Sequence, residues 1–323
     1  MNGDPTFEDV LAAAERILGH VHRTPVMTSR AIDEITGARL HFKCENLQKV
    51  GAFKARGATN AVLSLDDEAA NRGVATHSSG NHAAALAFAA GIRGVPAHVV
   101  MPWSAPPVKK AAVAGYGAQI TECEPTLEAR ESTLEKVVAR TGATFVHAYD
   151  NPKVIAGQGT ASLELITDVP DLDIVMAPVG GGGLMSGTAI AVSSSRPDIT
   201  ILGSEPAGAD DAYRSLRDGT RYPSVDPKTI ADGLLTSLSD RTFRILSEGI
   251  DGILTVGEEA IIRAMRLLWE RMKLVVEPSG AVPLGAVLEH RERFTDRRVG
   301  LIISGGNVDL GRLPWGVASG REH

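Results

Sequence analysis

The chain has 323 residues, with 33 lysines and arginines against 39 aspartates and glutamates, and carries a formal net charge of −6 at pH 7. This length accommodates one large or two modest domains with a full hydrophobic core. The acidic balance gives no support for binding to nucleic acid or to an anionic membrane, so small metabolites are the expected partners. The two cysteines form neither a CxxC pair nor a metal-ligand cluster, which agrees with a reducing cytoplasm.

The first 65 residues predict a helix, an extended segment, a strand and a second helix. The opening sequence MNGDPTFEDVLAAAERIL is typical of a capped amphipathic helix that starts near Asp4 or Thr6. Pro25 favours an extended conformation before it, and residues 39–44 have the pattern of a short strand. Gly51 then interrupts the pattern, and residues 52–65 have the composition of a helix.

Lys54 lies in the first turn of this predicted helix, where a cation is disfavoured. Helix N-termini carry partial positive charge, and Arg56 adds a second positive neighbour, so we expect both to push protons off the Lys54 amine. A neutral amine is a nucleophile, as Schiff-base chemistry with a carbonyl cofactor requires. The alternative interpretation is a surface lysine on an amphipathic helix.

From residue 73 onward, strand-like and helix-like segments alternate. The first series consists of VATH, HAAALAFAAG, AHVVMP, a helix ending near Gly115, AQITEC, a helix to Arg140, and ATFVHAY. The second consists of a helix at 152–166, a strand at 173–179, a helix from Leu184, the strand ILGSE, a long polar segment, helices at 258–273 and 280–289, and the strand VGLIIS. Such alternation indicates parallel strands with crossover helices, so we predict an α/β fold of two doubly wound units.

Gly180 to Gly183 form a glycine-rich loop between an apolar strand and a helix. Successive glycines let several main-chain N–H groups converge on one anion, and the helix N-terminus adds a favourable dipole, so phosphate is the expected occupant. Met185 and Ser186 break the GxGxxG pattern, and no GK[ST] ending follows, which disfavours dinucleotide and ATP sites. The alternative is a tight strand-to-helix turn.

The order of the motifs identifies a family. The motifs KCENLQKVGAFKARGA, SSGNHAAALA, VIAGQGT, PVGGGG, IADG, WERMKLVVEPSGA and SGGNVDL occur between about Thr24 and Leu310. The chain thereby resembles the pyridoxal 5′-phosphate (PLP) enzymes of the tryptophan-synthase-β fold type, in the branch that holds serine and threonine dehydratases and serine racemase. The resemblance implies a homodimer with PLP in the cleft between a large domain, 1–72 and 150–323, and a small mobile domain, 73–149.

The resemblance also implies which residues bind the cofactor. Lys54 would form the Schiff base, and Phe53 would lie against the ring. Asn81 would donate a hydrogen bond to the 3′-oxygen and Ser304 would bond the ring nitrogen. The phosphate would be held by Gly180, Gly181, Gly182, Gly183 and Leu184.

For the substrate, the resemblance implies that the loop of Ser78, Ser79, Gly80, Asn81 and His82 grips the carboxylate, although helix capping alone would explain one serine and Asn81. Ser79 matches the serine that racemases place on the cofactor face opposite the lysine, where a second acid and base is needed. Arg130 matches an arginine on the substrate side; by itself it would be a helix-surface charge.

An acidic loop, SEPAGADD, suggests a metal site. Glu205, Ala209 and Asp211 repeat the spacing at which serine racemases bind a divalent cation, and oxygen ligands suit Mg²⁺ or Ca²⁺, with Mn²⁺ as a further option. The alternative is a solvated acidic loop.

The expected activity is that of an ammonia-lyase that converts serine or threonine to a 2-oxo acid and ammonia, with serine racemase activity as well. One alternative keeps the fold and changes the substrate to threo-3-hydroxyaspartate or another hydroxy amino acid. Another is a non-catalytic protein that binds PLP or an amino acid. GAFKARGA lacks the asparagine loop of cysteine synthases, which disfavours a β-replacement synthase. Tyr149 departs from both branches, since racemases have Asn there and threonine dehydratases usually have Phe.

Overall fold

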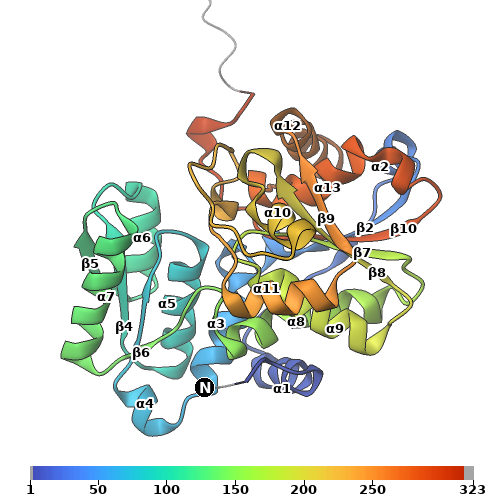
Figure 1. The fold of residues 1–323 in the computed structure, drawn as a ribbon. Helices are drawn as coiled ribbons and strands as arrows, with labels where there is room; N and C mark the ends of the chain where they lie inside the picture. Colours follow the sequence, from blue (N-terminus) through green and yellow to red (C-terminus); the bar gives the residue numbers. More distant parts are fainter. Residues whose placement is uncertain (1–2, 316–323) are drawn as a thin grey trace, which may run out of the picture.

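The computed structural model describes residues 3–315, and its strands form two sheets that lie side by side (Figure 1). The strands of this described part are β1 (Val26–Met27), β2 (Arg39–Cys44), β3 (Val74–His77), β4 (Ala97–Pro102), β5 (Gln119–Cys123), β6 (Thr144–Phe145), β7 (Ile174–Pro178), β8 (Thr200–Pro206), β9 (Gly252–Val256) and β10 (Arg298–Ile303). The larger sheet has the order β1-β2-β10-β7-β8-β9, and the smaller one has the order β5-β4-β3-β6. All neighbouring strands are parallel except β1 and β2, which confirms the predicted α/β class.

Helices cover both faces of each sheet. The described α-helices are α1 (Phe7–Ile17), α2 (Arg30–Thr36), α3 (Lys54–Leu63), α4 (Asp67–Asn71), α5 (Asn81–Arg93), α6 (Pro107–Gly115), α7 (Leu127–Thr141), α8 (Pro152–Asp168), α9 (Gly183–Ser195), α10 (Asp211–Asp218), α11 (Asp240–Gly249), α12 (Glu258–Leu267) and α13 (Pro278–Glu289). On the larger sheet, α12 and α13 pack on one face while α8, α9 and α11 pack on the other. On the smaller sheet, α5 and α6 lie opposite α7.

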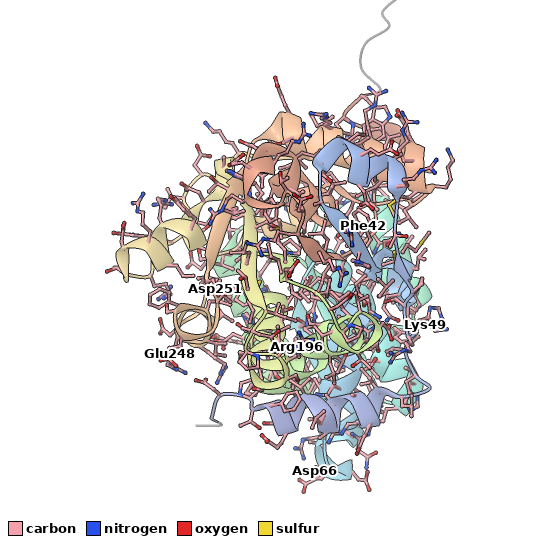
Figure 2. The ribbon with its side chains drawn as sticks, turned by 90° about the vertical axis from the view of Figure 1, so that its right-hand side faces the viewer. Phe42, Lys49, Asp66, Arg196, Glu248 and Asp251 are labelled. Carbon is pink, nitrogen blue, oxygen red and sulfur yellow. The ribbon has the colours of Figure 1, made fainter. Side chains whose placement is uncertain are left out.

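Alternating side chains of β10 show how the larger sheet is held between its two helical layers. Val299, Leu301 and Ile303 join the core on the α12 and α13 side, whereas Ile302 joins the core on the α8 and α9 side. Gly300 admits no side chain, because a Cβ there would lie 2.8 Å from Leu165. Figure 2 shows Phe42 within this interior, while the charged side chains Asp66, Glu248 and Asp251 lie on the surface.

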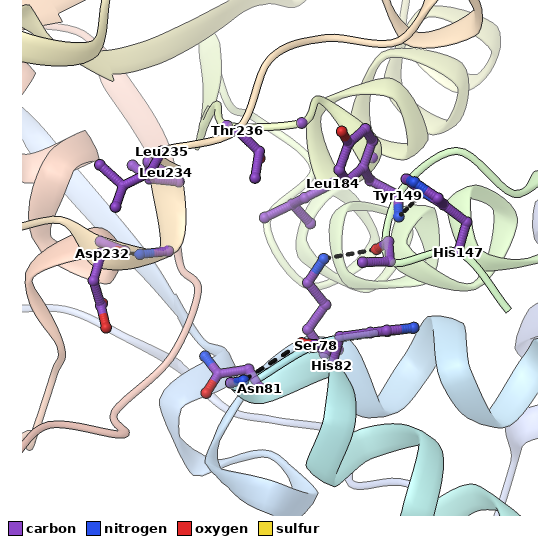
Figure 3. A pocket seen from close by; sticks show the side chains of 18 of the residues that line it. Ser78, Asn81, His82, His147, Tyr149, Leu184, Asp232, Leu234, Leu235 and Thr236 are labelled. Carbon is purple, nitrogen blue, oxygen red and sulfur yellow. Dashed lines mark hydrogen bonds between the residues drawn. The ribbon is translucent and has the colours of Figure 1, made fainter. Parts of the chain in front are cut away.

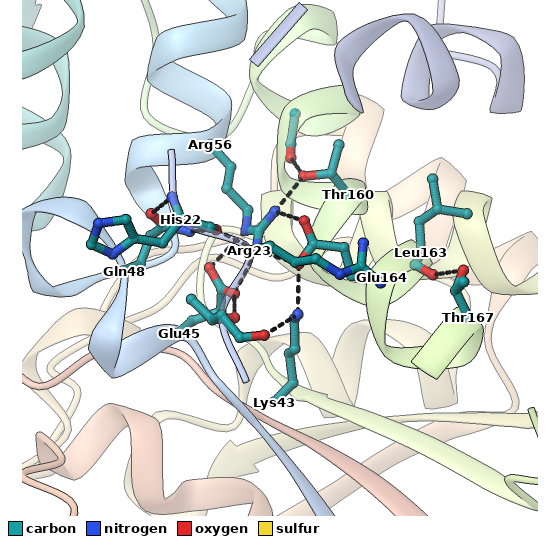
Figure 4. Close-up of polar contacts among 12 residues, drawn as sticks. His22, Arg23, Lys43, Glu45, Gln48, Arg56, Thr160, Leu163, Glu164 and Thr167 are labelled. Carbon is teal, nitrogen blue, oxygen red and sulfur yellow. Dashed lines mark hydrogen bonds and ion pairs between the residues drawn. The ribbon is translucent and has the colours of Figure 1, made fainter. Parts of the chain in front are cut away.

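α3 connects the two parts of the molecule, since it packs against α5 beside the smaller sheet and against α8 beside the larger one. Its first turn is fixed by a fully buried arginine (Figure 4). Arg56 pairs with Glu45 at 2.8 Å and with Glu164 at 2.7 Å, and Lys43 pairs with Glu164 as well. The two cations balance the two carboxylates, and the guanidinium is fully hydrogen-bonded, so the fold tolerates the burial of these charges. The network therefore orients the start of α3.

The structure corrects three expectations about elements. The sequence pattern predicts no helix or strand in the polar segment after β8, but this segment contains α10, α11 and β9. The strand predicted through Tyr149 ends at Phe145, and residues 146–151 form an irregular segment. The helix predicted at 258–273 is α-helical to Leu267 and continues as a π-helical turn, Leu268–Met272.

All four strands of the smaller sheet lie within the segment 73–149 that we predicted to be the small domain. The boundaries of the two domains and the mobility of the smaller one stay predictions. Residues 1, 2 and 316–323, which the predicted large domain includes, lie outside the described residues. Within residues 3–315, no helix has the length and apolar character needed to cross a membrane.

Candidate active site

A cavity of about 780 Å³ opens between the two sheets, at the carboxyl ends of β3, β7 and β10. Most of the predicted site residues line it: Phe53, Lys54, Ser78, Ser79, Gly80, Asn81, His82, Arg130, Gly180, Gly181, Gly182, Gly183, Leu184 and Ser304. Glu205, Ala209 and Asp211 do not line it. Segments far apart in the sequence therefore meet where ligands of parallel α/β folds bind.

Lys54 is the first residue of α3, with Phe53 as the N-cap. Its side chain borders the cavity, and its Nζ atom donates a hydrogen bond of 2.8 Å to the main-chain oxygen of Ala148. Burial lowers the pKa of the Lys54 amine to about 8. The expected contribution of Arg56 is wrong, because that side chain points into its own carboxylate network and burial accounts for the lowered pKa.

The tetraglycine loop leaves no room for side chains. A Cβ at Gly181 would lie 2.4 Å from the ring of Tyr149, and one at Gly183 would lie 2.8 Å from the Cβ of Tyr149. Gly182 has φ +83°, a conformation that favours glycine, and leads directly into α9. The main chain is therefore exposed to the cavity at the N-terminus of a 13-residue helix, which is suited to an anion.

Two further main-chain contacts place Phe53 and Ser304 next to each other. Phe53 donates from its N atom to the Ser304 oxygen at 3.0 Å, and Ala52 forms an isolated bridge with Gly305. Ser304 directly follows β10, is buried, and lines the cavity beside the start of α3.

Asn81 is the first residue of α5 and lies at the cavity (Figure 3), where a buried carboxylate holds its side chain. Its Nδ2 donates to Glu277 at 3.0 Å, and its Oδ1 accepts from Asn307 at 2.9 Å. Burial raises the pKa of Glu277 to about 7, with the nearby Asp232 adding to the effect. Sequence reasoning missed Glu277, although it stands in the EPSGA motif directly before α13.

Three histidines line the cavity between β3, α5 and the end of β6. Burial lowers the pKa of His82 to about 3 and of His147 to about 4, and lowers that of His77. His147 Nδ1 accepts hydrogen bonds from the N atoms of Tyr149 and Asp150, so its Nε2 carries the proton. The sequence motifs indicate only His82 of these three. His77 ends β3 and His147 lies just after β6, so position at the carboxyl end of a strand is the sequence signal that finds the other two.

The mouth of the cavity carries several charges. Lys109 on α6 pairs with Asp232 at 2.9 Å, which joins the smaller-sheet side to the segment before Leu234. Arg130 on α7 donates through Nε to the oxygen of Thr126 at 3.4 Å and forms no ion pair with a described residue. Arg221, after α10, pairs with Asp240 at 2.7 Å.

The predicted metal residues lie at the end of β8. Glu205 accepts hydrogen bonds from the N atoms of Ala212 and Tyr213 at 3.1 and 2.8 Å. Burial raises the pKa of Glu205 to about 9 and that of Asp211 to about 6. Both Asp211 carboxylate oxygens are buried without a hydrogen-bond partner; the nearby Ser224 hydroxyl lowers the Asp211 pKa somewhat but does not reach hydrogen-bonding geometry.

Comparison with known proteins agrees with this geometry. Residues 17–305 match the family described as "Pyridoxal-phosphate dependent enzyme". The beta-hydroxyaspartate dehydratase of Paracoccus denitrificans (strain Pd 1222) is 53% identical over 311 residues, 96% of this chain and 99% of that protein. The crystal structure of serine racemase from Dictyostelium discoideum superposes with a TM-score of 0.91 at 51% identity, covering 95% of this chain and 99% of that one. The crystal structure of T.th. threonine deaminase has a TM-score of 0.90 at 48% identity, covering 94% and 99%.

The predicted resemblance is confirmed over nearly the whole chain, by sequence and by fold. The chain belongs to the family of pyridoxal-phosphate dependent enzymes.

Proposed function

We propose that this protein is a PLP-dependent ammonia-lyase that converts small β-hydroxy amino acids to 2-oxo acids and ammonia. The observation that carries this proposal is the buried Lys54 amine, whose lowered pKa keeps a large fraction neutral near pH 8, in a cavity that also holds the tetraglycine loop. Relatives named dehydratase, deaminase and racemase of hydroxy amino acids support it.

The residues present fit PLP. The PLP aldehyde needs a neutral amine, which Lys54 offers. The phosphate needs main-chain donors, which Gly180–Gly183 offer where no Cβ fits. The hydroxyl of the buried Ser304 would bond the ring nitrogen. When bound, PLP supplies an electron sink for the substrate α-carbon. A serine hydroxyl does not hold the ring nitrogen protonated as a carboxylate would. We therefore infer that the ring would withdraw electrons from the substrate only moderately.

The reaction then requires removal of the proton from the α-carbon of the substrate. Lys54, in its neutral form, takes the α-proton at Nζ, where the Ala148 oxygen orients the amine. The main-chain N–H groups of the loop 78–82 bind the α-carboxylate at the start of α5. Loss of the β-hydroxyl as water leaves an unsaturated amine, whose hydrolysis consumes a water and gives the 2-oxo acid and ammonia. Net water consumption is therefore zero.

Racemase activity is the second candidate, and Ser79 favours it. Its side chain lines the same cavity as Lys54 but comes from the loop before α5. We infer that Ser79 delivers a proton to the face of the α-carbon that Lys54 does not reach, which inverts the configuration.

We further propose that a divalent cation, Mg²⁺ or alternatively Ca²⁺ or Mn²⁺, binds Glu205, the main-chain oxygen of Ala209 and Asp211. The two unpartnered oxygens of Asp211 are acceptors suited to a hard cation. A homodimer and a cytoplasmic location are part of the proposal; the free Cys44 and Cys123 agree with a reducing compartment.

A panel of amino acids tests the function. Purified holoenzyme is incubated with L- and D-serine, L-threonine and threo-3-hydroxyaspartate, and both 2-oxo acid and enantiomer are measured. The proposal expects oxo acid from at least one of them and inversion of serine that Ser79→Ala removes while elimination persists. Absence of oxo acid and of inversion from every substrate would refute it.

A further inference from the structure

A short segment, residues 147–150, contacts both ends of the site proposed for the cofactor. The main-chain oxygen of Ala148 accepts the hydrogen bond of 2.8 Å from the Lys54 amine. The ring of Tyr149 lies against the glycine loop, where a Cβ at Gly181 would be 2.4 Å from that ring. Movement of this segment would therefore alter the surroundings of the amine and of the anion-binding loop together.

Hydrogen bonds within the segment give it a fixed shape. Nδ1 of His147 accepts from the N atoms of Tyr149 at 3.3 Å and of Asp150 at 2.9 Å. The rings of His147 and Tyr149 also pack edge to face, with their centroids 4.5 Å apart (Figure 3). Burial lowers the pKa of His147 to about 4, so its ring stays neutral near pH 7 and keeps Nδ1 as an acceptor. A force on one end of the segment is thus passed to its other residues.

Asp150, at the end of the segment, is tied to two other parts of the chain. Its carboxylate pairs with Arg241, the second residue of α11. Arg241 also pairs with Asp4, before α1, at 3.4 Å, and Arg244 of α11 donates two hydrogen bonds of 2.7 and 2.8 Å to the carboxylate of Asp4. Two carboxylates and two guanidinium groups therefore join the residues before α1, the helix α11 and the 147–150 segment.

This network is better suited to hold a position than an isolated surface pair. The side chain of Arg241 is 21% exposed and those of Asp4 and Asp150 are each 34% exposed, so water competes only in part for these charges. The double contact of Arg244 with Asp4 has the geometry that makes guanidinium–carboxylate pairs directional. None of the four side chains lines the cavity, so none would touch a bound ligand.

We propose that Asp150 and Arg241 are positioning residues, whose ion pair holds this segment against the Lys54 amine and the glycine loop. The inference rests on the proposed function and adds residues that touch neither substrate nor cofactor. Loss of either charge would loosen the segment and let water reach Lys54. Because burial is what lowers the pKa of this amine, access of water would raise the pKa again.

Two variants, Asp150→Asn and Arg241→Gln, separate positioning from a direct effect of charge. A direct effect would move the pKa of Lys54 in opposite directions, down on loss of the negative charge and up on loss of the positive one. A loosened segment raises the pKa in both variants. The histidines on which the charge of Lys54 acts, His82 and His147, have pKa values of about 3 and about 4, so they add no charge when the amine titrates.

Trace acetylation of the full-length apoprotein with acetic anhydride across a range of pH, followed by peptide mapping, measures the pKa of Lys54 without any cofactor. Both variants are expected to raise this pKa by about half a unit, which is about a threefold loss of neutral amine below the pKa. Arg241→Lys keeps the charge and should stay close to the unmodified protein. Arg23→Gln is the matched control, since it removes a partly exposed ion pair with Asp168 away from the cavity, and should cause no shift.

Titration with PLP gives a second readout. The Kd for PLP should rise about fivefold in Asp150→Asn and in Arg241→Gln, which is the upper range for a partly exposed ion pair, and should stay unchanged in Arg23→Gln. If either variant fails to fold by circular dichroism, Asp4→Asn takes its place, and it is expected to raise the pKa of Lys54 by a smaller amount.

Opposite shifts of the Lys54 pKa, a rise in only one variant, or no rise in either would overturn the inference, as would an unchanged Kd in a protein that binds PLP. If the unmodified protein does not take up PLP, the proposed function fails, and the acetylation result still decides whether the ion pair positions Lys54.

Discussion

Lys54 and Ala148 are joined by a hydrogen bond of 2.8 Å from Nζ to the main-chain oxygen, and this contact links the start of α3 to the wall that follows β6. A main-chain oxygen orients the amine without supplying the negative charge that would keep it protonated. Burial then lowers the pKa of the amine to about 8, which is the property that condensation with an aldehyde needs.

The rate of cofactor uptake should therefore depend on pH. Only the neutral amine condenses with the aldehyde, so uptake of PLP by the apoprotein should rise with pH and level off above about 8. At pH 7 it should be about tenfold slower than on the plateau, because each unit below the pKa reduces the neutral fraction tenfold. Stopped-flow absorbance measures the rate. Pyridoxamine 5′-phosphate, which has no aldehyde, serves as the control and should show no such rise; a flat profile for PLP would contradict the assignment.

Replacement of the buried arginine should destabilise the fold strongly. Arg56→Met leaves the fully buried Glu45 without a cation and Glu164 with Lys43 as its ion-pair partner. The free energy of unfolding should fall by about 3–5 kcal/mol, as is typical when one partner of a buried pair is removed.

Urea denaturation measures this loss. Arg263→Met, an exposed position on α12, is the control and should change stability by no more than about 0.5 kcal/mol. A similar small change for Arg56→Met would mean that the network in Figure 4 does not hold α3.

Glu277 should make stability depend on pH. Its pKa is raised from 4.5 to about 7 by burial, so the folded state binds more protons than the unfolded chain between these values. Its stabilising contribution is therefore present below about pH 4.5 and is lost as pH rises through 7. Glu277→Gln removes this dependence, although it loses one acceptor for Asn81 or Asn307.

Thermal unfolding between pH 5 and pH 8 checks this prediction. The stability of Glu277→Gln relative to the unmodified protein should improve as pH rises from 5 to about 7 and then level off. Glu259→Gln, at an exposed position, should show no such trend. A difference that is constant across this range would argue against the raised pKa.

Divalent cations should stabilise the protein through Asp211. Its two carboxylate oxygens are buried and have no hydrogen-bond partner, which costs free energy. A bound cation would coordinate these oxygens and remove that cost. Saturating Mg²⁺ should raise Tm by about 2–4 °C, since ligand at about one hundred times its Kd contributes about 2.7 kcal/mol.

The matched variants are Asp211→Asn, which should lose the shift, and Asp218→Asn at the end of α10, which should keep it. Retention of the shift by Asp211→Asn would place the cation elsewhere or show that it binds without specificity.

Sequence patterns predicted most of the fold because buried parallel strands and the helices between them are strongly periodic. Residues 39–44 form β2 at the predicted bounds, and α3 places Lys54 in its first turn. The polar segment after β8 was missed because α10 and α11 are short amphipathic helices whose apolar positions are few. Only packing against the larger sheet distinguishes them from loop.

Parts of the candidate site were beyond sequence reasoning for a different reason. Glu277, Asn81 and Asn307 are far apart in the chain, and nothing in their local sequence shows that one buried carboxylate joins them. For Lys54, the sequence predicted a lowered pKa but missed burial as its cause. The contribution expected from Arg56 was wrong, because the direction of that side chain depends on Glu45 and on Glu164 of α8.

The most direct test of the account is to locate the cofactor bond. Holoenzyme is reduced with borohydride, digested and mapped by mass spectrometry, with Lys54→Ala as the control. The account predicts a pyridoxyl label on Lys54 and none in the variant. A label on another lysine, or an unlabelled protein that still turns over a hydroxy amino acid, would contradict it.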